Sequence, residues 1–132
     1  MSESIQHLPA ELCSLYHLLR QPRRCYLVLY MARGDPPHDV DTLARQVAGK
    51  INDTSPPNVP WDEYKNVIVS LRQTHIPALC EQDVVRADDQ HKQLTPGSQF
   101  NLAVMLIHIG NLLWLSENTA HWSPPEDTEM TD

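Results

Sequence analysis

The 132-residue sequence is poor in basic residues and in glycine, and each shortage excludes a class of protein. Ten lysines and arginines stand against seventeen acids, which gives a formal charge of −7. This balance argues against a protein that holds nucleic acid by bulk positive charge. With only four glycines, the chain has no Gly-rich phosphate loop, and it has no nucleophile elbow or recognisable pair of catalytic carboxylates. We therefore expect that the protein is not an enzyme.

Cysteine is also scarce. The chain has three, Cys13, Cys25 and Cys80, and an odd number cannot all pair within one chain. No C-x-x-C motif occurs, and the spacings Cys13 to His17 and His75 to Cys80 are not those of a zinc site. We expect no metal ion and no cofactor. The first residues lack the basic region and the apolar region of a signal peptide. Together with the free thiols, this favours a location in the reducing cytoplasm.

The negative charge is concentrated at the C-terminal end. Residues 117–132 hold five acids and no lysine or arginine, so the rest of the chain is nearly balanced. The stretch also contains Pro124 and Pro125, and it is expected to be a disordered acidic tail. An acid excess is compatible with a halophilic source and equally with a device for solubility.

Proline and glycine divide the remaining sequence, which is long enough for one domain with a sizeable core, into short helical segments. Helices are expected at residues 10–20, 23–33, 42–48 and 61–73, with a short fifth helix from Pro77 through Glu81. The second is apolar on almost every side and should be the central core helix. Asp41 is the expected N-cap of the third helix and Gly49 its stop, with a loop over residues 50–60.

A small β-hairpin should follow the helices, because residues 84–86 and 93–95 flank a polar turn. Helices followed by a hairpin are the plan of a winged helix-turn-helix, in which residues 61–73 form the recognition helix and the hairpin forms the wing. The predicted fold is thus mainly α with a small β-hairpin wing, plus a long C-terminal helix. The predicted division is a winged helix-turn-helix domain at 1–98, a dimerisation helix at 99–116 and the acidic tail at 117–132.

Three stretches add a more specific sign: LLRQPRRCYLVLYMARGD, VDTLARQVAGK and YKNVIVSLRQTHIPALCEQDVV. Through them, residues 18–95 resemble a haloarchaeal winged-helix family catalogued as a domain of unknown function and described as transcriptional regulators. The resemblance implies a winged-helix fold and a DNA-binding role. The family usually has glycine where Asp83 stands, and aspartate tolerates the left-handed backbone of such a turn better than most residues. The wing tip, Asp88-Asp89, would repel a phosphate backbone.

The predicted recognition helix has one apolar face and one polar face. The candidate DNA-binding residues are Lys65, Asn66, Val69, Ser70, Arg72 and Gln73 on this helix, and Arg86 and Lys92 at the wing. Asparagine and glutamine pair with adenine edges, arginine pairs with guanine, and an exposed valine can meet a thymine methyl. Asp62 and Glu63 favour the alternative of a solvated helix face. The alternative function is a winged-helix module whose acidic surface binds another protein and not DNA. His75 is expected to close the helix, and Arg23 and Arg24 are expected in surface ion pairs.

Residues 100–115 form a very apolar segment that is interrupted by Asn101, His108, Gly110 and Asn111. A membrane span needs about twenty apolar residues, so this segment is short and too polar for one, and a membrane is not among the expected partners. On a monomer, the helix would expose large apolar side chains on nearly any face, and burial against a second copy resolves this. The candidate dimerisation residues are Phe100, Val104, Ile107, Leu112 and Leu115. The expected partners are double-stranded DNA and a second copy; burial in the chain's own core and membrane association stay open for this segment.

Overall fold

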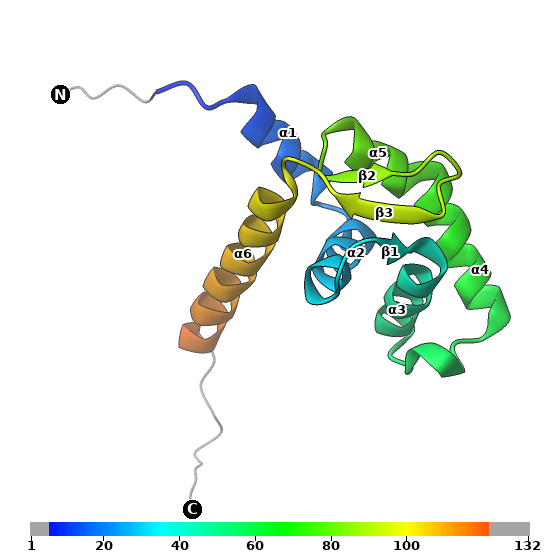
Figure 1. Cartoon of the computed structure of the whole chain (residues 1–132). Helices are drawn as coiled ribbons and strands as arrows, with labels where there is room; N and C mark the ends of the chain where they lie inside the picture. Colours follow the sequence, from blue (N-terminus) through cyan, green and yellow to red (C-terminus); the bar gives the residue numbers. More distant parts are fainter. Residues whose placement is uncertain (1–5, 122–132) are drawn as a thin grey trace, which may run out of the picture.

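The computed structural model describes residues 6–121, and the side chains of residues 6–118. The described chain is mainly helical, with a small antiparallel sheet and a C-terminal helix (Figure 1). The helices are α1 (Ala10–Leu18), α2 (Pro22–Arg33), α3 (Val40–Asn52), α4 (Trp61–Ser70), α5 (Ile76–Glu81) and α6 (Phe100–His121). The strands are β1 (His38–Asp39), β2 (Val85–Ala87) and β3 (Gln93–Pro96). A 3₁₀ turn, η1 (Pro56–Asn58), precedes α4, and a π-helical segment, η2 (Leu71–His75), joins α4 to α5.

Helix α2 supplies the centre of the core, as its apolar sequence predicts. Leu27 and Val28 are completely buried, and α2 contacts α3 on one side and α6 on another. Pro22 starts this helix, where a missing N–H costs nothing, and Gly34 follows its last residue. The core continues through the buried faces of α3 and α4 and the inner residues of the hairpin.

The start of α3 differs from the prediction, because Asp39 and not Asp41 is the N-cap. The Asp39 carboxylate accepts hydrogen bonds from the Thr42 backbone N–H at 3.0 Å and from Thr42 Oγ1 at 3.1 Å. The backbone N–H of Val40 donates to the Lys92 carbonyl at 2.9 Å. This bond to the hairpin holds the first residue of the helix in place. Because Asp39 is the cap, the Asp41 side chain is available for other contacts.

The end of α3 also differs, because Gly49 lies inside the helix and does not stop it. The helix continues to Asn52 and ends at Asp53, whose φ is 52°. The chain then folds back over Gly49, where the Thr54 N–H donates to the Gly49 carbonyl at 2.8 Å. A Cβ on Gly49 would stand 2.5 Å from the Thr54 carbonyl oxygen, so this residue serves a close backbone approach.

The predicted helix over residues 61–73 has the expected start, but it does not end at Gln73. From Leu71 the chain widens into η2 and continues directly into α5. Pro77 lies in the first turn of α5 and lacks the N–H that an uninterrupted α-helix would use, and a π-helical turn accommodates such a break. His75 therefore lies within a continuous helical run and does not close it.

The predicted hairpin is confirmed as β2 and β3, and a third strand joins it in the order β1-β3-β2. Strand β1 was missed in the sequence because it is only two residues long, pairing His38 with Leu94 and Asp39 with Gln93. The turn before β2 is left-handed at Asp83, with a φ of 55°. The expectation that Asp83 tolerates a left-handed backbone in this turn is thus confirmed.

Candidate functional site

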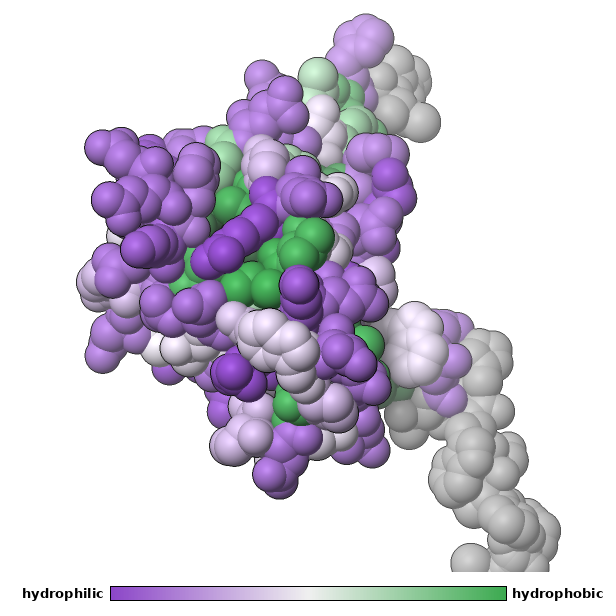
Figure 2. Space-filling model, turned by 90° about the vertical axis from the view of Figure 1, so that its right-hand side faces the viewer, coloured by the Kyte–Doolittle hydropathy of each residue, from purple (hydrophilic) through white to green (hydrophobic). Residues whose placement is uncertain are grey.

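The outward face of α4 and η2 carries the residues predicted to contact DNA. Lys65, Asn66, Arg72 and Gln73 are exposed, as is Val69, whereas Ser70 is half-buried. Tyr64, Val67 and Ile68 are buried on the other side of α4. Figure 2 turns the α4 side of the molecule toward the viewer and shows a mostly hydrophilic face around a small hydrophobic area.

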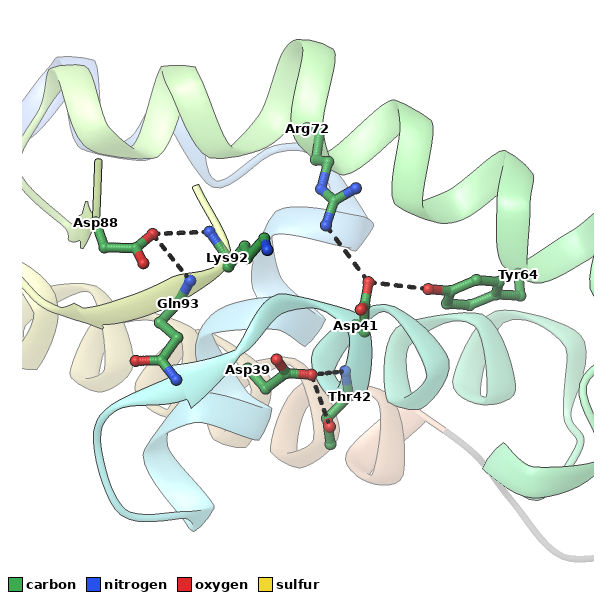
Figure 3. A network of polar contacts seen from close by, with 8 residues as sticks. All are labelled: Asp39, Asp41, Thr42, Tyr64, Arg72, Asp88, Lys92 and Gln93. Carbon is green, nitrogen blue, oxygen red and sulfur yellow. Dashed lines mark hydrogen bonds and ion pairs between the residues drawn. The ribbon is translucent and has the colours of Figure 1, made fainter. Parts of the chain in front are cut away.

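An aspartate from α3 engages this face (Figure 3). Asp41 Oδ1 accepts a hydrogen bond from the Tyr64 hydroxyl at 3.0 Å and lies 3.4 Å from Arg72 Nη2. Burial, with the hydrogen bond to Asp41, raises the pKa of Tyr64, so its hydroxyl remains a donor. The Arg45 guanidinium lies 4.3 Å from the centre of the Tyr64 ring. Asp41 therefore ties α3 to α4 and η2, and it offsets part of the Arg72 charge.

The β2–β3 hairpin carries a second paired arginine. Arg86 Nε and Nη2 each donate to the Asp83 carboxylate at 2.9 Å. Ser98 also donates to this carboxylate, from its N–H at 3.0 Å and its hydroxyl at 2.6 Å. The Arg86 and Ser98 hydrogen bonds hold the pKa of Asp83 well below its usual range. Arg86 is thus engaged at the base of the hairpin, and its charge is largely matched there.

Lys92 lies at the other end of the hairpin and next to the start of α3. Its N–H donates to Asp88 Oδ1 at 2.7 Å, and its carbonyl accepts from Val40, the neighbour of Asp41. Within the described chain, neither Lys92 nor Lys65 forms an ion pair. The structure therefore brings Lys92 close to the Asp41 contacts, whereas Arg86 is held at Asp83.

One buried polar contact behind this face was predicted wrongly. Arg24 does not form a surface ion pair: it is buried, with Nε donating to His75 Nδ1 at 3.0 Å and Nη1 donating to the Leu18 carbonyl at 3.1 Å. Burial lowers the pKa of His75, and the nearby Arg24 and Arg23 lower it further. His75 is thus neutral, with Nδ1 as the acceptor, and it links η2 to α2.

The three cysteines are free thiols, with Cys13 exposed and Cys25 and Cys80 half-buried. Burial raises the pKa of the Cys25 thiol, which donates to the Leu19 carbonyl at 3.0 Å. Among residues 6–121, no three histidines, cysteines or acids are grouped so that they could hold a metal ion.

The C-terminal helix divides the predicted dimerisation residues. Phe100 is only 6% exposed and belongs to the chain's own core, and Val104 and Ile107 pack partly against that core. These three face inward because Gly97 and Gln99 donate backbone hydrogen bonds to Val84 and Asp83, which set the helix start against the hairpin. The assignment of Phe100 to a dimer contact is therefore corrected, whereas Leu112 and Leu115 are exposed.

The helix itself is longer than predicted. It continues to His121, so residues 117–121 of the predicted tail are helical, and residues 122–132 lie outside the described part. Phe100–Asn118 has a mean hydropathy of 1.3 and is long and apolar enough to cross a membrane by length and composition.

Together these features define a small, mainly helical domain with a three-stranded antiparallel sheet, an exposed polar helix face and an apolar C-terminal helix. The chain matches the model of a domain of unknown function, DUF7344, over residues 16–95, and it therefore belongs to this family. The match ends within β3, so α6 lies outside it. Neither the curated proteins nor the solved structures contain a match to the chain.

Proposed function

We propose that the protein is a winged helix-turn-helix regulator of transcription that binds double-stranded DNA as a homodimer. The order α2, β1, α3, α4–α5, β2, β3 and the strand order β1-β3-β2 support a winged-helix assignment. In this assignment α3 and α4 form the helix-turn-helix, and the β2–β3 hairpin is the wing. The free thiols favour a reducing compartment, and the cytoplasm is the one we propose.

The observation that carries the proposal is the outward face of α4 and η2. It presents two amides, Asn66 and Gln73, with the aliphatic Val69 between them and Lys65 beside them, all exposed. Amides pair bidentately with adenine, and an aliphatic side chain meets the thymine methyl. This face thus offers the groups needed to read base edges in a major groove.

Contacts with DNA phosphates should contribute less to the affinity of this protein than to that of a basic regulator. The chain carries a charge of −7, and Arg72 and Arg86 are each paired with an aspartate. Because few phosphates are neutralised, few counterions are released from the DNA on binding. The affinity should therefore fall less steeply with salt concentration than that of a basic regulator. Specificity then rests on base contacts.

The test is to select a preferred duplex from a random pool and to measure binding by fluorescence anisotropy on that duplex and on a scrambled one. Asn66→Ala or Gln73→Ala should weaken binding to the preferred duplex by roughly 1–3 kcal/mol and hardly change binding to the scrambled one. Lys65→Ala should weaken binding to both alike if it meets phosphate. Asn101→Ala is the matched control, because Asn101 is an exposed amide on α6, on the opposite side of the molecule from α4 (Figure 1). Unchanged affinities for Asn66→Ala and Gln73→Ala on both duplexes would exclude this face as the reading surface.

A second candidate is a winged-helix module that binds a protein and not DNA. The pairing of Arg72 with Asp41 favours it, as do Asp62 and Glu63, which are exposed at the start of α4. A random pool from which no duplex is enriched would favour this candidate over DNA binding.

A further inference from the structure

Helix α6 presents two faces with different surroundings. Its inner face packs on the chain's own body through Phe100 and Ala103, which are buried. Its opposite face is apolar and exposed, and four of the side chains there, between 40% and 66% exposed, follow one another at regular intervals: Leu102, Met105, Ile109 and Leu112. We call these four residues the outer stripe.

The outer stripe has the spacing of a coiled-coil seam. Its members follow one another at intervals of three, four and three residues, which is the a–d–a–d pattern of a heptad repeat. None of them is charged, and His108, Gly110 and Asn111 lie off the stripe. The side chains of such a seam pack between those of a second helix that carries the same pattern.

A bilayer is a poor occupant for this face, because the helix is anchored at its first turn. Phe100 and Ala103 lie in the core, and Ile107 still packs partly against it, so the free helix runs from His108 to His121. At 1.5 Å per residue this is about 21 Å, which is shorter than the roughly 30 Å of a hydrocarbon core. Glu117 and Asn118 shorten the apolar part further.

A second copy of the chain fits the stripe by symmetry. The four residues lie symmetrically about residue 107, so an antiparallel partner sets Leu102 against Leu112 of the partner subunit and Met105 against Ile109 of the partner subunit. Each contact is then repeated by the two-fold axis, as an isologous interface requires. The exposed apolar area of the four side chains is on the order of several hundred Å², which is comparable to the largest apolar patches on soluble monomers, and such patches are often functional.

A groove at the base of α6 sets the direction of the partner helix. It has a volume of about 780 Å³, and its lining includes Pro9, Leu12 and Leu15 from the α1 region and Leu102 from α6. At the far end of α6, Leu112 and Leu113 are among the most exposed apolar side chains of the described chain. Only antiparallel pairing lays this end of one copy over the groove of the other.

We propose that two copies associate through the outer stripes of antiparallel α6 helices, with the far end of each helix covering the groove between α1 and α6 of its partner. This inference specifies the homodimer of the proposed function and is independent of whether the dimer binds DNA. It replaces Phe100, Val104, Ile107 and Leu115 by Leu102, Met105 and Ile109, and it retains Leu112.

The first experiment measures molecular mass by light scattering. The wild-type chain should have twice the mass of a 15.1 kDa chain, and the double variant Met105→Glu/Leu112→Glu should be a monomer with an unchanged circular dichroism spectrum. Leu115→Glu is the matched control, because Leu115 is also exposed but lies off the stripe, and this variant should remain a dimer. A monomeric wild type, or a double variant that remains a dimer, would overturn the proposal.

The second experiment tests direction by disulfide trapping in a Cys13→Ser background, which removes the one exposed native thiol. Leu102→Cys/Leu112→Cys should form covalent dimers on mild oxidation, whereas Leu112→Cys alone should not. Trapping by Leu112→Cys alone would show a parallel pair and would contradict the antiparallel arrangement.

A third measurement separates the other occupants. Wild-type chain that is monomeric and floats with phosphatidylcholine vesicles would assign α6 to a membrane and overturn the proposal. A dimer that selects no duplex leaves this inference standing and overturns the DNA-binding function, and a DNA-binding monomer does the reverse.

Discussion

Alanine should destabilise the domain at Gly49 and stabilise it at Gly110, although both glycines lie inside helices. The gain from helix propensity is about 0.5–1 kcal/mol at either position. At Gly49 the added Cβ would stand 2.5 Å from the Thr54 carbonyl oxygen and 3.4 Å from the Pro56 nitrogen, so the backbone turn after α3 must move by roughly 1 Å. Overpacking of this kind costs about 1–3 kcal/mol, which exceeds the gain. At Gly110 no atom lies within 4 Å of the added Cβ, so only the gain remains.

Urea unfolding followed by far-UV circular dichroism, at one fixed protein concentration, measures both changes. The unfolding midpoint should fall for Gly49→Ala and rise for Gly110→Ala. A Gly49→Ala variant as stable as the wild type would refute the close approach of Thr54 to Gly49, and with it the extension of α3 to Asn52.

Two further predictions concern the polar contacts around α4 and η2. The folded-state pKa of His75 is lowered from 6.5, so below about pH 6.5 the unfolded chain takes up a proton that the folded chain does not, and stability falls as the pH is lowered through this range. His75→Gln should flatten the pH dependence of the urea midpoint. The flattening should be partial, because the pKa of His38 is lowered as well. An unchanged slope would contradict the assignment of this pH dependence to His75. Asp41→Asn should raise the affinity for the preferred and the scrambled duplex several-fold by anisotropy, because it releases Arg72 and retains an acceptor for Tyr64. Asp41→Ala should in addition lose about 0.5–1.5 kcal/mol of unfolding free energy with that hydrogen bond, and equal stabilities of the two variants would argue against it.

The sequence predicts the elements whose signals are local. Pro22 and the apolar run after it indicate α2, and the polar turn between two short apolar runs indicates the hairpin. Asp83 is readable as a left-handed residue because only a few residue types tolerate this conformation.

Long-range contacts decide the features that local patterns miss. Asp39 and Asp41 are equally good N-caps by type, and the choice depends on the bond from Val40 to Lys92, some fifty residues further along the chain. Asp41 meets Arg72 across 31 positions of the sequence, which no short spacing reveals. The apolar residues of α6 surround the helix, so periodicity does not show which side packs on the body; the contacts of Gly97 and Gln99 with the β2 turn determine it.

Amide chemical-shift mapping on the isotope-labelled chain, titrated with the duplex that it selects, tests the central claim most directly. The account predicts the largest shifts along the outward face of α4 and η2, at Asn66, Val69 and Gln73, with smaller shifts at Lys92 on the β2–β3 hairpin. Shifts confined to α1 and α6, or no shifts at saturating duplex, would contradict the assignment of this face as the surface that reads DNA.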